Sequence, residues 1–186
     1  MSTKNLKTKL QRLIKENSLL RGPNFTLASG ETSKYYFNMK NTTFDPEGSS
    51  LLSDLILEIL EPFDVESIGG LEMGAVPIAA SVTSRSFQKG RPIGGFFVRK
   101  ETKKHGTKSL IEPEQVAGTK VAVIEDVTTT GTSALRAVDA LEAAGCKVSV
   151  VITLVDRMEG AKKAFAGRDL DFIALFDSSD FDLADG

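Results

Sequence analysis

The segment Val121–Ser133 constrains the fold of this chain more than any other stretch. Four apolar residues lead into Glu125 and Asp126, and a hydroxyl-rich loop with Gly131 precedes the helical-looking Ala134–Ala137. This order predicts a buried parallel strand, a short loop and the start of a helix. Backbone N–H groups and hydroxyls in such a loop can hold a phosphate dianion. The two carboxylates would repel a bare phosphate, so we expect them to hold sugar hydroxyls or a metal ion. The segment therefore predicts a ligand with a phosphate beside a ribose.

A simpler interpretation fits part of the same segment. A strand that ends in Asp and runs into Thr-rich residues could be an N-capped helix in any α/β protein. That interpretation accounts for one aspartate but not for the whole run Glu125–Ser133.

Length, charge and cysteine content narrow the class of protein. The 186 residues suffice for one α/β domain, and the charge of −2 gives no general attraction to nucleic acid or anionic membranes. No stretch reaches the roughly 18 apolar residues of a membrane span. The single cysteine, Cys146, excludes an intrachain disulfide and is expected to be a small buried thiol. We therefore expect a cytoplasmic protein without nucleic-acid or membrane partners.

Apolar runs and turn residues predict alternating strands and helices over a single domain, 1–186. The expected strands lie near residues 25–27, 35–37, 67–71, 93–98, 121–126, 148–155 and 170–176, and the expected helices near 6–14, 45–60, 74–85, 132–144 and 159–165. This alternation predicts an α/β fold with a parallel β-sheet flanked by helices. Ligands of such sheets bind at the carboxyl ends of the strands, where each candidate site segment lies.

A basic stretch follows the strand at 93–98. Residues 99–108 carry five bases, one acid and the only histidine of the chain, and they show no apolar periodicity. The hydrophilic stretch continues to about residue 118. One interpretation is an exposed, solvated loop. The other is a mobile lid that closes over an anionic ligand, since long loops without structure in compact domains are often functional.

The apolar strand, the acid pair and the Thr-x-Gly-Thr/Ser loop together resemble the phosphoribosyl-pyrophosphate (PRPP) motif of the type I phosphoribosyltransferases. The resemblance implies their fold and PRPP as the ligand. It also implies that the acid pair contacts the ribose hydroxyls and that the loop anchors the 5′-phosphate. The PRPP-binding residues of the motif would be Glu125, Asp126, Val127, Thr128, Thr129, Thr130, Gly131, Thr132 and Ser133.

The basic stretch resembles the catalytic loop of the orotate phosphoribosyltransferases within that family. Arg99, Lys100, Lys103 and His105 occupy the positions that contact pyrophosphate in the family. The resemblance implies a homodimer in which each loop (99–118) closes over the neighbouring subunit's site. It also implies Mg²⁺ as the cofactor, bound mainly through PRPP and without a direct protein ligand.

Residues 1–40 are similar to the N-terminal helix and hood of the same enzymes. Tyr36 and Phe37 would lie near the orotate ring, although hairpin core is an equally open interpretation for both aromatics. Thr129 would contact the same base. Arg157, which follows a predicted strand, fits the position that pairs with the carboxylate of orotate, because a planar fork suits a carboxylate. Taken alone, it could be a surface arginine.

Two positions depart from the family pattern. Several relatives have Lys where this chain has Ala28, and some have Tyr-Lys where Glu72 and Met73 stand. Glycine-rich loops of this kind bind pyrophosphate through backbone N–H groups. The departures therefore bear on Ala28 and Met73 as ligand contacts rather than on the family assignment.

The resemblance implies transfer of a 5-phosphoribosyl group from PRPP to orotate, which gives orotidine 5′-phosphate and pyrophosphate in pyrimidine biosynthesis. Glu125, Asp126, Lys103 and His105 would be the catalytic residues. One alternative is a phosphoribosyltransferase for another base, such as uracil or a purine. A second is a non-catalytic regulator that senses PRPP and binds RNA or DNA, although such proteins can lose the basic loop that this chain keeps.

Overall fold

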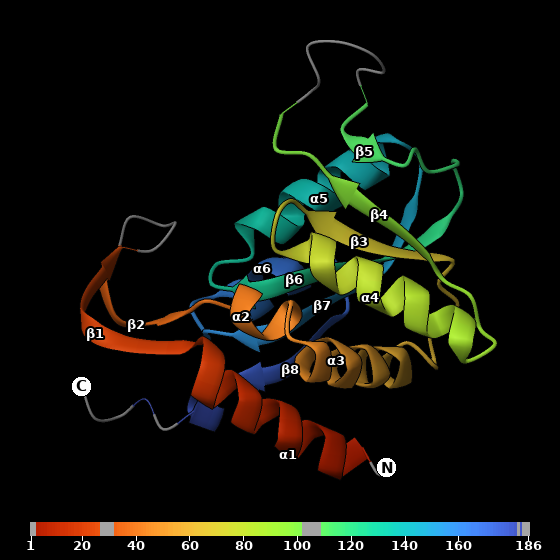
Figure 1. The fold of residues 1–186 in the computed structure, drawn as a ribbon. Coiled ribbons are helices and arrows are strands. Elements are labelled where there is room, and N and C mark those ends of the chain that lie inside the picture. The colour runs from red at the N-terminus through yellow and green to blue at the C-terminus, as the bar shows by residue number, and fades with distance from the viewer. Residues whose placement is uncertain (1–2, 27–31, 102–108, 182, 184–186) are drawn as a thin grey trace.

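The computed structural model describes residues 3–26, 32–101, 109–181 and 183. Its centre is a six-stranded sheet in the order β5-β4-β3-β6-β7-β8 (Figure 1). The strands are β3 (Ser67–Leu71), β4 (Gly94–Val98), β5 (Ile111–Glu112), β6 (Lys120–Thr128), β7 (Lys147–Asp156) and β8 (Phe172–Asp177). All neighbouring pairs are parallel except β4 and β5. The expected parallel sheet is confirmed, with one antiparallel edge strand added.

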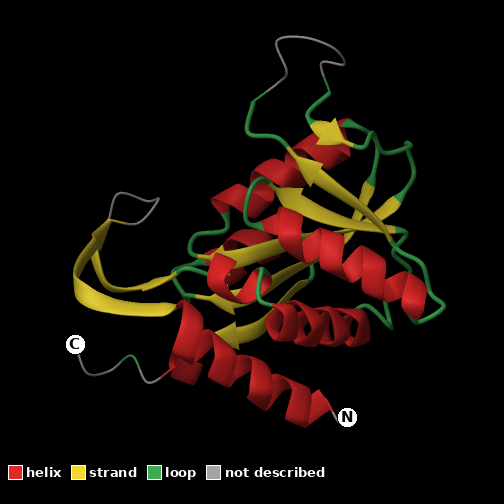
Figure 2. Ribbon diagram, viewed as in Figure 1, coloured by secondary structure: helices red, strands yellow, loops and turns green. Residues whose placement is uncertain are grey.

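Helices cover both faces of this sheet (Figure 2). The helices are α1 (Thr3–Leu13), α2 (Lys40–Thr43), α3 (Pro46–Ile59), α4 (Ala75–Gln88), α5 (Thr132–Ala143) and α6 (Ala161–Ala166), with a π-turn η1 (Ile14–Ser18) and a 3₁₀ turn η2 (Ser178–Phe181). One face packs against α3 and α4, with α1 lying on α3, and the other packs against α5 and α6. This double cover explains why the strands are almost continuously apolar.

The central strand β6 shows how local sequence produces this packing. Ala122 and Ile124 belong to the core beneath α3 and α4, whereas Val121 and Val123 belong to the core beneath α5. All four side chains are fully buried. Because side chains alternate along a strand, an unbroken apolar run suits a strand covered on both faces.

A two-stranded hairpin extends from the sheet near α1 (Figure 1). Its strands are β1 (Leu19–Thr26) and β2 (Thr32–Phe37), which pair antiparallel. The two expected N-terminal strands are therefore confirmed, but both begin earlier in the chain. Residues 27–31 lie outside the described residues, and Ala28 with them.

The hydrophilic stretch at residues 99–118 contains one short strand that was not predicted from the sequence. Ile111 and Glu112 form β5, which pairs antiparallel with Val98 and Phe97 of β4. Ile111 is buried in the core beneath α5. Two residues are too few to produce a periodic pattern, so only the pairing with β4 reveals this strand.

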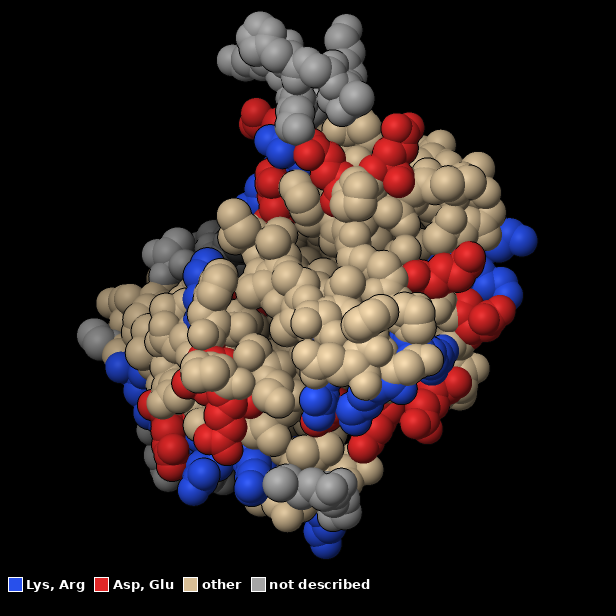
Figure 3. Space-filling model, turned by 45° about the vertical axis from the view of Figure 1, so that its right-hand side comes forward, with Lys and Arg blue, Asp and Glu red and all other residues tan. Residues whose placement is uncertain are grey.

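The outer face of α4 carries mostly small or apolar side chains. Ala80 is exposed there, and Phe87 is 78% exposed. Figure 3 shows a broad area without charged side chains across the middle of this side of the molecule. Exposed apolar side chains on one helix, such as Ala80 and Phe87, are common at interaction surfaces. No helix in the described part of the chain is long and apolar enough to cross a membrane.

We predict that Gly70→Ala destabilises the protein by roughly 1–3 kcal/mol, as overpacking of a core typically does. A Cβ at Gly70 would collide with the carbonyl oxygen of Ile124 and approach the Cβ of Ala75 to 2.9 Å. Urea unfolding would measure the change. Gly167→Ala is the matched control, because its Cβ would meet nothing nearer than 3.5 Å at a right-handed backbone position. Equal stability of the two variants would contradict the tight β3–β6 packing.

Candidate active site

The PRPP-like segment lies where the central strand leaves the sheet. β6 ends at Thr128, and α5 begins at Thr132 after a three-residue loop. Gly131 has a φ of 84°, and a Cβ there would approach the Phe165 ring to 2.9 Å. A side chain would therefore be strained by both the backbone and the packing, which explains the glycine.

A pocket of about 510 Å³ opens at this loop. The pocket brings together one acid of the pair, the whole hydroxyl-rich loop and one cation of the basic stretch. It is lined by Leu71, Lys100, Glu125, residues 127–134 and Arg136. These residues come from the ends of β3, β4 and β6 and from α5, so the site has the position expected for a parallel sheet.

Burial dominates the electrostatics of the acid pair. Glu125 is 7% exposed, and its Oε2 has no hydrogen-bond partner among the described residues. Burial, and then the neighbouring charge of Asp126, raise the pKa of Glu125 well above its usual value. Burial also raises the pKa of Asp126, although the N–H of Val127 donates to Asp126 Oδ1 at 2.9 Å. An unpartnered buried carboxyl oxygen suits a ligand that brings hydroxyl groups.

The loop between β3 and α4 lies directly against Asp126. A Cβ at Gly74 would come within 2.5 Å of Asp126 Oδ1. This close approach gives a physical reason for a glycine in the 69–74 loop. Met73 is 58% exposed, and the peptide bond between Glu72 and Met73 is cis.

The hydroxyl groups of the loop differ in whether they are free to bind a ligand. Thr128 is buried, and its Oγ1 donates to Thr153 Oγ1 of β7 at 2.9 Å. Thr130 and Thr132 are exposed, with their hydroxyl oxygens 2.9 Å apart. The Thr128 hydroxyl therefore ties the strands together, whereas Thr130, Thr132 and the exposed Ser133 are placed to meet a ligand.

Arg157 is buried, so the interpretation of it as a surface arginine is wrong. It is 6% exposed, and its Nε donates to Glu159 Oε1 at 2.8 Å while Nη2 donates to Ser33 Oγ at 3.1 Å. Its guanidinium carbon lies 4.2 Å from the centre of the Tyr35 ring. Arg157 therefore joins the carboxyl end of β7 to the hairpin.

The two hairpin aromatics occupy different environments. Tyr36 is 38% exposed and stacks on Phe25, with ring centres 6.0 Å apart. Phe37 is 3% exposed and packs edge-on against Phe181 at 5.1 Å. The geometry favours the hairpin-core interpretation for Phe37 and leaves Tyr36 available to a planar ligand.

Only the beginning of the basic stretch lies among the described residues. Arg99 Nη1 donates to Glu112 Oε1 at 3.4 Å, at the base of the loop. Lys100 lines the pocket, and its charge opposes the rise in the pKa of Glu125. Lys103 and His105 lie outside the described residues.

The acid pair suits a metal that takes most of its ligands from a substrate. Within the described ranges, no group of three or more His, Cys, Asp or Glu side chains is arranged to hold a metal ion. Glu125 and Asp126 offer only two carboxyl groups. Mg²⁺ commonly takes many of its ligands from substrate phosphates and water, so binding mainly through PRPP stays a prediction for this site.

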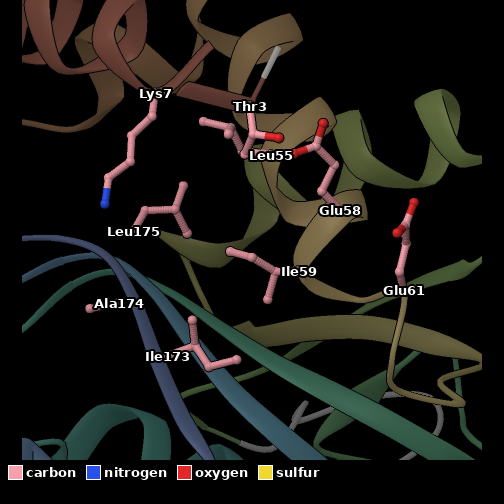
Figure 4. Close-up of a pocket in the computed structure, with 9 residues that line it drawn as sticks. All are labelled: Thr3, Lys7, Leu55, Glu58, Ile59, Glu61, Ile173, Ala174 and Leu175. Atoms are coloured by element: carbon pink, nitrogen blue, oxygen red, sulfur yellow. The ribbon is translucent and has the colours of Figure 1, made fainter. Parts of the chain in front are cut away.

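A second pocket, of about 650 Å³, lies between α1, α3 and β8 (Figure 4). Leu55, Ile59 and Leu175 line its middle, with Lys7 on one side and Glu58 on the other. It has no glycine-containing hydroxyl-rich loop and no buried acid pair. The smaller pocket at the end of β6 is therefore the candidate active site.

Comparisons with known proteins agree with this geometry. Residues 50–167 match the family model described as "Phosphoribosyl transferase domain". The chain is 48% identical over 185 residues to an orotate phosphoribosyltransferase of Bradyrhizobium sp. (strain ORS 278), which covers 97% of this chain and 100% of the relative. The chain belongs to the orotate phosphoribosyltransferase family.

Solved structures support the same assignment. The orotate phosphoribosyltransferase of Mycobacterium tuberculosis H37Rv, in complex with Fe(III) dicitrate, superposes with a TM-score of 0.85 at 36% identity, over 96% of this chain and 99% of that one. The complex of the same enzyme with PRPP superposes with a TM-score of 0.80 at 35% identity and the same coverage. These likenesses confirm the expected fold.

Three residues near the site were not predicted as site residues from the sequence. Arg136 lines the pocket from the second turn of α5, and Glu72 bonds to the backbone of Lys100. Lys40, at the start of α2, exerts its positive charge on Asp126 and so opposes the rise in its pKa. The motif itself could have drawn attention to Arg136, which follows it on the same helix. No local signal marks Glu72 or Lys40.

We predict that Glu125→Gln stabilises the ligand-free protein at neutral pH. Because the folded state favours the protonated acid, ionisation of Glu125 costs stability above its raised pKa. Below the ordinary glutamate pKa of about 4.3, both states bind the proton and the cost vanishes. The gain in Tm should therefore be full at high pH and shrink as the pH falls, at about 2–4 °C for each kcal/mol.

Thermal unfolding without ligand at several pH values would measure this effect. Glu114→Gln is the matched control, because Glu114 is exposed. A lower Tm for Glu125→Gln at neutral pH would contradict the assigned electrostatics.

Proposed function

We propose that this protein transfers a 5-phosphoribosyl group from PRPP to a ring nitrogen of orotate in pyrimidine biosynthesis. The bond from ribose C1 to pyrophosphate breaks, and pyrophosphate leaves with the electron pair. A C1–N bond to the base forms, and the ring nitrogen gives up its proton to solvent. One observation carries the proposal: the buried acid, the hydroxyl-rich loop and Lys100 line a single pocket in a chain of this family. This pocket can hold a ribose between a phosphate site and a cation.

The floor of the pocket would fix the sugar. The N-terminus of α5 and the hydroxyls of Thr130, Thr132 and Ser133 anchor the 5′-phosphate. Glu125 and Asp126 accept hydrogen bonds from the 2′- and 3′-hydroxyls. Fixing the ribose at both ends holds C1 between the incoming base and the leaving group.

Cations would neutralise the leaving group. Lys100 faces the pocket at the end of β4, and Arg99, Lys103 and His105 belong to the same basic stretch. Mg²⁺, when bound with PRPP, stabilises negative charge on the pyrophosphate oxygens. Loss of one donor that is well placed for such charge typically costs about 3–4 kcal/mol, or about 10²–10³ in rate.

The hairpin would select the base. Arg157 offers a planar guanidinium suited to the carboxylate of orotate, and its contacts with Ser33 and Tyr35 orient it from the hairpin side. Tyr36 and Thr129 would contact the ring. Phe37 would support the hairpin from the core rather than touch the base.

The same proposal includes a homodimer in the cytoplasm. A shallow pocket of about 290 Å³ lies between α4 and the edge strands β4 and β5, where Ala80, Phe97 and Pro113 line it. With the exposed Phe87 it forms an apolar surface that a second copy could cover in a symmetric contact. Residues 99–118 would then reach the site of the partner subunit. The buried free thiol of Cys146 suits a reducing compartment.

The proposed reaction predicts consumption of orotate that depends on PRPP and releases pyrophosphate, which ultraviolet absorbance can follow. Uracil, adenine and hypoxanthine are the comparison bases. A wild-type protein that uses another base, or none, would overturn the proposed substrate.

We predict that Lys103→Ala lowers turnover at saturating PRPP by at least about tenfold, while far-UV circular dichroism stays unchanged. Unchanged turnover in the variant would remove Lys103 from the mechanism.

The proposed dimer predicts that Ala80→Arg shifts the protein towards a monomer. A charged side chain on the apolar face of α4 would have to be desolvated in the contact. Analytical ultracentrifugation over a range of concentrations would measure the shift. Ala166→Arg, at an exposed alanine on α6, is the matched control. A variant that sediments like the wild type would exclude this face as the dimer contact.

A further inference from the structure

The backbone of Lys100 is hydrogen-bonded on both sides by residues from other parts of the fold. Its N–H donates to Glu72 Oε1 at 3.0 Å, and its carbonyl accepts from Arg136 Nη2 at 3.2 Å. Glu72 lies just after β3, and Arg136 lies on α5. The preceding residue is also fixed, because the N–H of Arg99 donates to the carbonyl of Leu110 at 2.8 Å.

Glu72 itself is anchored to the strand that it helps to extend. Its N–H donates to the carbonyl of Val98 at 2.8 Å, and its carboxylate reaches the N–H of Lys100. The contact therefore continues the β3–β4 pairing past the carboxyl ends of both strands.

The position of the Lys100 side chain depends on these backbone hydrogen bonds. Lys100 is exposed, so no surrounding core fixes its orientation, yet it lines the pocket that contains Glu125 and the hydroxyl-rich loop. A lysine side chain has much rotational freedom to lose when it binds a ligand. Fixing its backbone limits the region that its ammonium group can reach.

We propose that Glu72 and Arg136 are positioning residues that hold the peptide of Lys100, so that its ammonium group meets the pyrophosphate end of the substrate. The inference rests on the proposed function, in which Lys100 is a pyrophosphate contact. Neither residue needs to touch the substrate. Their effect on the reaction passes through Lys100.

The test compares truncated and conservative variants at both positions. Glu72→Ala and Arg136→Ala should each raise the KM for PRPP or lower kcat by roughly tenfold, because small misplacements of catalytic groups are costly. The KM for orotate should stay unchanged. Glu72→Gln keeps an acceptor and Arg136→Lys keeps a donor, so both should restore most of the activity. Unchanged kinetics in the alanine variants would overturn the proposal.

A double-mutant cycle separates positioning from direct contact. In a Lys100→Ala background, Glu72→Ala and Arg136→Ala should each cost less than about twofold more, because residues that act through one group are not additive. Equal losses in both backgrounds would mean that the residue acts on the substrate by itself, and would overturn its assignment.

Two controls have the same chemistry away from the pocket. Glu66 Oε2 accepts from the N–H of Lys120 at 2.9 Å, at the amino ends of β3 and β6. Arg168 donates to Asp139 and Glu142 on the far part of α5. Glu66→Ala and Arg168→Ala should leave the KM for PRPP unchanged. A rise equal to that of the test variants would mark a general loss of stability and overturn the proposal.

A failure of the proposed function would look different. A wild-type protein that does not consume orotate with PRPP rejects that function before any variant is compared. Calorimetry with pyrophosphate and Mg²⁺ then provides the readout. Loss of affinity in the alanine variants that disappears in the Lys100→Ala background would still support the positioning role. Losses of equal size in both backgrounds, or no loss, would overturn it.

Discussion

Two adjacent carboxyl groups near the end of β6, the buried Glu125 and the half-buried Asp126, are the constraint on which the candidate site depends. Burial raises the pKa of both Glu125 and Asp126, and the Oε2 atom of Glu125 has no partner in the described part of the chain. Carboxyl groups in such positions cost stability unless they are paired or hydrogen-bonded. A ribose that donates two hydroxyls would offset part of that cost. The two carboxyl groups therefore suit the ribose of the proposed reaction.

The surrounding fold supplies the opposite charge from separate elements. Lys100 approaches Glu125 from the end of β4, and Lys40 acts on Asp126 from the start of α2. Acids thus lie on the rigid central strand, whereas cations come from loops and short helices around it. This division suits a reaction in which the sugar stays fixed while a charged group leaves.

Helices and strands with a strong local sequence pattern have bounds close to the predicted ones. β3 has its predicted bounds, and α3 begins after Asp45, whose carboxylate accepts from the N–H of Gly48. Cys146 is buried as expected. By contrast, α2 and β5 are too short for periodicity to mark them. Phe37 shows the same limit, because hydrophobicity alone cannot distinguish a ring in the core from a ring beside a ligand.

The sequence alone determined the parallel sheet, the hydroxyl-rich loop beside an acid pair, and the family. These features depend on contiguous residues, such as the run from Glu125 to Ser133. The hydrogen-bonding groups of such a run lie close together whatever the rest of the fold. Only the tertiary structure showed that Lys100 lines the pocket and which residues hold its backbone there. Glu72 and Arg136 lie 28 and 36 positions from Lys100 along the chain, and they meet its backbone only because β3, β4 and α5 converge. Contacts across such separations depend on strand order and register, which no local pattern encodes.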